Sequence, residues 1–118
     1  MQKVQLFFVR TGMEFNKATI MRGDTHKIGI FIVEKDQEGA MLRFVCKTNL
    51  SEPPLIEKAI QPSVVTENFL KAYFDILPEE TSIFPEPLTF IYDLERTING
   101  EVTTLEQGTF SVKLDVAT

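Results

Sequence analysis

The most regular feature of the chain is an alternation of apolar and polar residues, which predicts β-strands with one buried face. Every second position is apolar in two C-terminal segments: Leu88, Phe90, Tyr92 and Leu94 in the first, and Phe110, Val112, Leu114 and Val116 in the second. Between the segments lies Asn99-Gly100, the dipeptide that best tolerates the positive φ angles of a two-residue hairpin. Residues 88–117 therefore predict a hairpin that ends in a long final strand, with Gly108 at a bulge or corner.

The first half of the chain contains shorter strand-like segments. Residues 18–21 predict a short strand, and residues 27–33 form a run rich in β-branched side chains. This run stops at the polar segment 35–39, which ends in glycine as turns commonly do. Residues 40–47 are then predicted to be its partner in a second hairpin. Prolines bracket residues 55–60, which predicts an edge strand or an extended loop.

Residues 66–77, "TENFLKAYFDIL", match two different periodicities. A helix would place Phe69, Leu70, Tyr73, Phe74 and Leu77 on one stripe, with Thr66 as its N-cap. A strand would point Leu70, Ala72, Phe74 and Ile76 inward. We favour the strand because every neighbouring segment is β and a lone helix would leave one sheet face uncovered.

Seven to nine short strands at regular spacing predict an all-β fold, an antiparallel β-sandwich of the immunoglobulin-like type. The 118 residues are expected to form one domain, residues 1–118. No stretch approaches the roughly 20 apolar residues of a membrane-spanning helix. The start of the chain has too short an apolar run for a secretory signal peptide, so synthesis and folding in the cytoplasm are expected.

The charge of the chain excludes some partners. A formal net charge of −5 argues against sequence-independent nucleic-acid binding, which needs clustered Lys and Arg. The charge is uneven, with +3 over residues 1–47 and −8 over residues 48–118. This asymmetry either reflects solubility alone or helps identical copies to meet through complementary surfaces.

Candidate chemistry is sparse. The only cysteine, Cys46, excludes an intrachain disulfide, and its apolar surroundings predict a buried core residue. The only histidine, His26, cannot build a zinc site alone and is expected at the surface or at a strand edge. The carboxylate pairs Asp36/Glu38 and Glu79/Glu80 fall in polar turns, where solvated acids are ordinary. We therefore expect no enzyme, no catalytic residue, no cofactor and no metal site.

The order of turns and strands resembles a known family. The segment "IMRGDTHKIGIFIVEKDQEGA" is similar to the opening of the immunoglobulin-like domain of bacteriophage baseplate upper proteins and related tail-associated structural proteins. The segments "YFDILPEET" and "TFIYDLERTINGEVTTLEQGTFSVKLDVAT" resemble the closing pattern of that family. The matching positions are Tyr92-Asp93, Gly100, Thr104-Leu105, Gly108-Thr109-Phe110 and Asp115-Val116.

This resemblance implies a non-enzymatic phage or prophage structural protein, located in the virion as a baseplate, tail or other assembly component. Its partners would be identical subunits and other virion proteins, with no nucleic acid and no membrane. One alternative is a carbohydrate-binding or host-attachment sandwich. The absence of Trp and the presence of only two Tyr disfavour it, because such modules stack exposed aromatic rings on sugars. A second alternative is a small acidic phage-encoded inhibitor of a host protein.

The N-terminal strands are apolar on both faces, which predicts a surface for self-association. A two-layer sandwich covers only one face of each sheet, so a second apolar face needs another cover. The candidate surface consists of Phe7, Val9, Phe31, Val33 and Val45. Either an identical neighbour covers it in a closed oligomer, or loops or a short helix from residues 49–70 do so.

Overall fold

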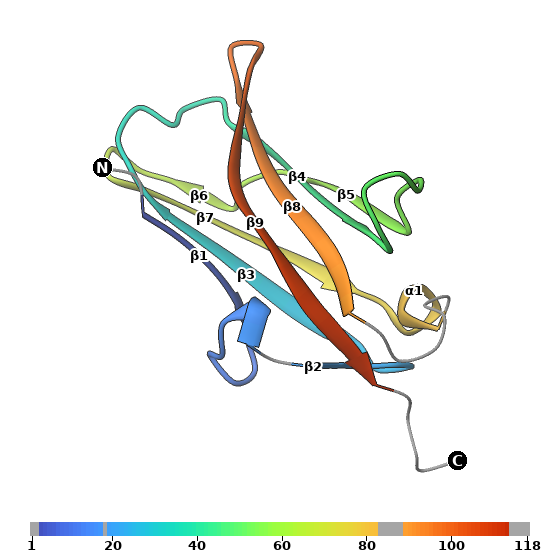
Figure 1. Ribbon diagram of the computed structural model, residues 1–118. Helices are drawn as coiled ribbons and strands as arrows, with labels where there is room; N and C mark the ends of the chain where they lie inside the picture. Colours follow the sequence, from blue (N-terminus) through green and yellow to red (C-terminus); the bar gives the residue numbers. More distant parts are fainter. Residues whose placement is uncertain (1–2, 18, 83–88, 114–118) are drawn as a thin grey trace.

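Two β-sheets pack face to face in the computed structural model, which describes residues 3–17, 19–82 and 89–113 (Figure 1). The four-stranded sheet has the order β1 (Lys3–Phe8), β3 (His26–Val33), β7 (Phe69–Ile76) and β6 (Val64–Val65). The five-stranded sheet has the order β2 (Thr19–Met21), β9 (Glu101–Lys113), β8 (Thr89–Ile98), β4 (Met41–Lys47) and β5 (Ile56–Ile60). The predicted fold, an immunoglobulin-like antiparallel β-sandwich, is confirmed with nine strands in the described residues.

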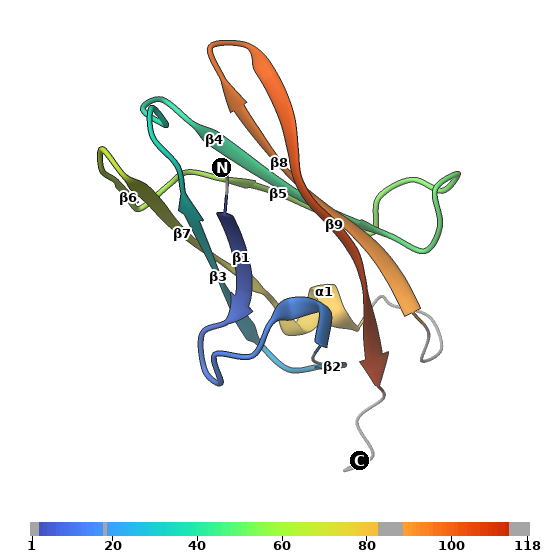
Figure 2. The same ribbon diagram turned by 60° about the vertical axis from the view of Figure 1, so that its left-hand side comes forward.

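One strand pair departs from the antiparallel rule. The short strand β2 runs parallel to the end of β9 and pairs with residues 111–113. Two short helices complete the described elements: the 3₁₀-helix η1 (Phe15–Lys17) and the α-helix α1 (Pro78–Thr81). Figure 2 shows η1 between the layers, on the side where β1 ends one sheet and the short β2 and its neighbour β9 end the other.

The contested segment 66–77 is a strand, as we favoured. In β7 the four residues that the strand interpretation points inward are all buried: Leu70, Ala72, Phe74 and Ile76. The strand pairs with β3 along its whole length and with β6 at its start. The period-two pattern therefore prevails over the helical stripe, because only the strand satisfies the backbone of β3 on this side.

The predicted hairpin between residues 27–33 and 40–47 is wrong. β3 and β4 are strands, but they belong to different sheets, and the segment between them crosses from one layer to the other. Both edges of β3 are already occupied by β1 and β7, so β4 has no free edge there to pair with. The crossing is shaped by positive φ angles at Asp36 and Gly39.

The hairpin of β8 and β9 is confirmed, with positive φ at Asn99 and Gly100. The predicted bulge is misplaced, because the register shifts at Leu94/Glu95 and leaves Leu105, not Gly108, as the extra residue. Gly108 instead pairs with Tyr92, and a Cβ there would lie 2.8 Å from the tyrosine oxygen. The predicted inward residues Leu88, Leu114 and Val116 lie outside the described residues.

Replacing Gly100 with valine should lower the free energy of unfolding by about 1–2 kcal/mol, because a β-branched residue resists a φ of +80°. Thermal unfolding followed by circular dichroism measures this loss. Thr104→Val, in the same hairpin but within the strand β9, is the matched control and should change the melting temperature little. An unchanged melting temperature in Gly100→Val would contradict the turn geometry.

Candidate binding face

The outer face of the four-stranded sheet carries aromatic and basic side chains, and we call it the aromatic face. The register of β1, β3 and β7 places these side chains in rows across the sheet. One row contains Gln5, Phe31 and Lys71, and the next contains Phe7, Gly29 and Tyr73. The rows adjoin Val33 opposite Phe69 at one end and Lys27 opposite Asp75 at the other.

A shallow groove of about 260 Å³ crosses the middle of this face. It is lined by Gln5, Phe7, Ile30, Phe31, Lys71 and Tyr73. The missing side chain of Gly29 makes room for one wall of the groove, because the ring of Phe7 lies over the glycine and a Cβ at this position would overlap it. The middle row therefore has aromatic rings on β1 and β7, and the ring from β1 covers the glycine between them.

Two lysines lie against the aromatic rings. The Nζ atom of Lys71 is 5.6 Å from the ring centre of Phe31 and 5.4 Å from that of Phe69. The Nζ atom of Lys27 is 5.9 Å from the ring centre of Tyr73. Among the described residues neither lysine takes part in an ion pair. The face thus combines ring surface with positive charge that remains available to a partner.

Four of the five predicted surface residues lie on or beside this face. Phe7 and Phe31 line the groove, Val33 ends the outward row of β3, and Val9 is exposed just past the end of β1. Val45 is a correction. It lies on β4 in the other sheet and is only 5% exposed, between Glu57 of β5 and Asp93 of β8. The apolar pattern alone does not reveal which sheet a strand joins.

Sequence reasoning missed the contribution of β7. Phe69, Lys71 and Tyr73 face outward, and Tyr73 is 41% exposed. Their signal was present in the strand interpretation of residues 66–77, since the positions between the four inward residues must point outward. The residues 49–70 do not cover this face as a loop or helix, because residues 56–60 and 64–65 are edge strands of the two sheets.

The outer face of the five-stranded sheet differs in its charge arrangement. There Arg43 lies between two carboxylates, 3.1 Å from Glu95 and in contact with Glu57. The hydrogen bond that Arg43 donates to Glu57 raises the pKa of Arg43 above its ordinary value. Arg43 is thus satisfied within the chain, in contrast to Lys27 and Lys71 of the aromatic face.

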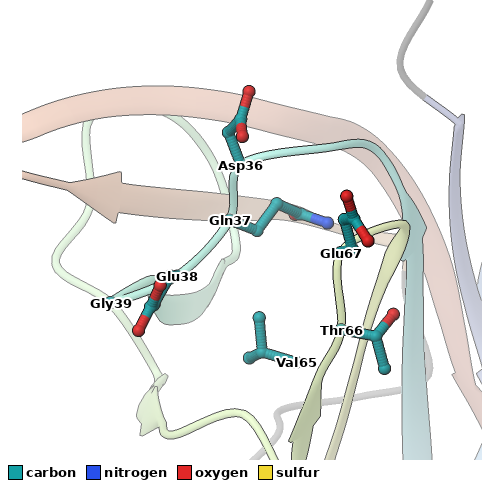
Figure 3. Close-up of a pocket in the computed structure, with 7 residues that line it drawn as sticks. All are labelled: Asp36, Gln37, Glu38, Gly39, Val65, Thr66 and Glu67. Atoms are coloured by element: carbon teal, nitrogen blue, oxygen red, sulfur yellow. The ribbon is translucent and has the colours of Figure 1, made fainter.

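An acidic cleft of about 570 Å³ lies at one end of the sandwich, between the β3–β4 crossing and the β6–β7 turn (Figure 3). Its lining includes the carboxylates of Asp36, Glu38 and Glu67 together with Val65. No group of three or more His, Cys, Asp or Glu side chains in the described part of the chain is arranged to hold a metal ion. The cleft is therefore an open acidic surface.

Cys46 is fully buried in β4, as the sequence predicted. Burial raises the pKa of its thiol to about 12, so the thiolate is absent at neutral pH. His26 opens β3, and its Nε2 lies 3.2 Å from the carbonyl oxygen of Met21. The two residues that sequence analysis considered for chemistry are thus held in structural contacts.

Cys46→Ala should lower the free energy of unfolding by about 1–2 kcal/mol through lost packing, without changing the fold. Ellman's reagent should react slowly with the native protein and rapidly in denaturant, and the two rates measure how well the thiol is protected. Rapid labelling of the native protein would contradict the buried position.

No helix among the described residues is long and apolar enough to cross a membrane. No family model matches the chain, and no curated protein matches it. Among solved structures, the chain resembles the C-terminal domain of Wzt, with a TM-score of 0.55 and 12% identity, over 99% of this chain and 75% of that one. It is also aligned with AggA, the major subunit of aggregative adherence fimbriae type I from Escherichia coli, with a TM-score of 0.38 and 10% identity, over 98% of this chain and 96% of that one. The likeness to the Wzt domain supports the sandwich fold.

Proposed function

We propose that this protein is a non-enzymatic assembly component of a bacteriophage virion and that it acts through protein–protein contacts made by its aromatic face. The observation that carries the proposal is the cluster of Phe7, Phe31, Phe69 and Tyr73 on the outer side of a sheet whose inner side already faces the core. Aromatic residues are enriched at protein interfaces because they bury a large area at low entropic cost.

The polar residues of the face favour a specific contact over non-specific hydrophobic association. Lys27 and Lys71 are held over ring faces, which fixes their ammonium groups near the groove. Charged groups at a rim steer a partner and set its orientation more than they add affinity. The face should therefore bind an apolar partner that carries negative charge in preference to an apolar partner without it.

The contact is tested by light scattering across a concentration series, alone and with co-expressed virion proteins. Phe7→Glu and Phe31→Lys should abolish association, because each places a charge in the middle of the apolar area. Thr109→Lys adds a charge to the outer face of the other sheet and should associate like the wild type. Association that survives both groove substitutions would refute the role of this face.

The virion part of the proposal rests on the resemblance in turn and strand pattern to the phage baseplate family. It is tested by mass spectrometry of purified phage particles from a lysogen or an infection that carries this gene. Peptides of the chain should be present in a fixed ratio to the major capsid protein. A chain that remains in the particle-free lysate would refute a virion location.

Carbohydrate binding in the same groove is a second candidate function. Tyr73 and Phe31 offer ring surface at the groove, while Gln5 and Lys71 offer polar groups that can hydrogen-bond to hydroxyls. Affinity electrophoresis through gels that contain bacterial polysaccharides tests this function. Retardation that is lost in Tyr73→Ala but kept in Thr109→Lys would favour it.

A further inference from the structure

The tip of the β8–β9 hairpin extends beyond the other strands of the sandwich (Figures 1 and 2). The last residue of β8 that pairs with β4 is Thr97, opposite Met41. Residues 98–102 therefore pair only within the hairpin, Ile98 with Glu101 and Val102 with Thr97, and we call residues 98–102 the arm. The arm is preformed, because Asn99 and Gly100 adopt the positive φ angles of a tight turn.

The arm carries an exposed apolar side chain beside a carboxylate. Val102 is 59% exposed, the largest exposure of any described valine, and Glu101 beside it is also exposed. In the described part of the chain Glu101 forms no ion pair. Val102 and Glu101 are successive residues of β9, so their side chains lie on opposite sides of the arm and flank its free edge, since β9 pairs with β2 only at residues 111–113.

The aromatic face cannot pair with a copy of itself without cost. A two-fold contact centred on the groove would bring the Lys71 side chains of both copies close together, whereas the carboxylates Asp75 and Glu14 lie at the ends of their rows. Like charges brought together at an interface destabilise it. The face therefore requires a partner with a negative charge and an apolar group, which is the composition of the arm.

We propose that the arm of one copy docks in the groove of the aromatic face of a second copy. With its free β9 edge laid along the groove, the arm would place Val102 on the rings of Phe31 and Tyr73 on one side and the carboxylate of Glu101 near the ammonium group of Lys71 on the other. The arm belongs to the five-stranded sheet, and the groove faces away from that sheet, so the two surfaces meet only between copies.

Such a contact joins two different surfaces, so a pair of copies keeps one free arm and one free groove. Contacts of this kind continue into a closed ring or an open filament. This inference rests on the proposed function, since it names the occupant of the same face. It predicts that assembly weakens as salt rises, because part of the attraction is between exposed charges.

The test mixes two variants that are each defective on one side. Lys71→Glu disables the groove, and the double variant Glu101→Lys/Val102→Lys disables the arm. Each variant alone should stay monomeric in light scattering, with an apparent Kd for assembly at least tenfold weaker than that of the wild type. An equimolar mixture of the two should form dimers and stop there, because only one intact arm and one intact groove are present per pair.

Matched controls distinguish the effect of changing the net charge from the effect of changing the arm or the groove. Lys113→Glu and Glu52→Lys make the same changes at exposed positions away from arm and groove, and both should assemble like the wild type. Circular dichroism of every variant checks that it folds. Tyr73→Ala provides a second groove variant that adds no charge, and it should also weaken assembly.

Three results would overturn the inference. A wild type that stays monomeric at high micromolar concentration excludes docking between copies. Arm variants that assemble like the wild type, while groove variants do not, exclude the arm as occupant and leave the proposed function intact. Groove variants that assemble like the wild type refute both the inference and the role of the aromatic face.

Discussion

Replacing Phe15 with alanine is expected to lower the free energy of unfolding by about 3–5 kcal/mol, the range for deleting a fully buried phenylalanine. Phe15 lies in η1, outside both sheets, yet none of its surface is exposed. Its ring centre lies 4.9 Å from that of Tyr92 and 5.1 Å from that of Phe110. It also contacts Phe8 and Phe44, so one side chain joins the inner faces of both sheets.

The expected destabilisation depends on where Phe15 lies in the fold as much as on the apolar area that its ring buries. η1 lies on the side of the sandwich where β1 ends one sheet and β2 and β9 end the other (Figure 2). Phe15 is buried there between rings from both sheets. Alanine would leave a cavity lined by aromatic rings, which the surrounding strands cannot close without breaking their register.

Chemical denaturation measures this loss, with Phe31→Ala as the matched control. Phe31 is also a phenylalanine in a described element, but its side chain is on the outer face, so its removal should cost no more than about 1–1.5 kcal/mol. Equal losses from the two substitutions would contradict the central position of Phe15.

The fold could be predicted from sequence because several of its strands, above all β7 and β8, alternate between buried and outward residues. Residues such as Phe90 and Tyr92, or Leu70 and Phe74, keep period two over several pairs, and a shift by one residue would expose the whole row. Phe15 gave no such signal, since it is one apolar residue in a polar stretch. Its burial depends on where η1 lies relative to β8 and β9, which local pattern does not encode.

The candidate surface was predicted in part for the same reason. Apolar outward positions mark Phe7 and Phe31 correctly, because the pattern assigns faces within a strand. Val45 has the same pattern, but the pattern does not assign strands to sheets. Because the chain crosses between β3 and β4, Val45 lies in the other sheet, where the neighbouring strands bury its side chain. The role of Lys71 emerged only when the register placed it over Phe31.

The crossing itself is held by a polar network that the sequence did not reveal. Arg96 of β8 donates from Nη1 to the carboxylate of Glu34 and to Oε1 of Gln37, the latter at 3.0 Å. The amide of Gln37 donates in turn to the backbone oxygen of Glu34 at 3.0 Å and to that of Ile32 at 3.4 Å. Gln37 is 1% exposed and Arg96 is 8% exposed, so water cannot replace these bonds freely.

Glu34→Ala is therefore expected to lower the free energy of unfolding by about 2–3 kcal/mol, because it leaves the guanidinium of Arg96 buried without its counter-charge. The carboxylate of Glu34 is about one third exposed, which keeps the expected loss below that of a fully buried pair. Arg96→Met should also destabilise, while the double variant should lose at least about 1 kcal/mol less than the two single losses combined.

This network also lies where the arm leaves the body of the sandwich, since Arg96 precedes Thr97, the last residue of β8 that pairs with β4. Glu34→Ala should then weaken assembly by more than its effect on folding explains. Without the network the arm can adopt more orientations relative to the sandwich, so fixing it in one orientation on docking costs more entropy. Denaturation of the four species of the cycle and light scattering of the folded Glu34→Ala variant measure the two effects separately. Single losses that add within about 0.5 kcal/mol would show that Glu34 and Arg96 act independently and that the network does not hold the crossing.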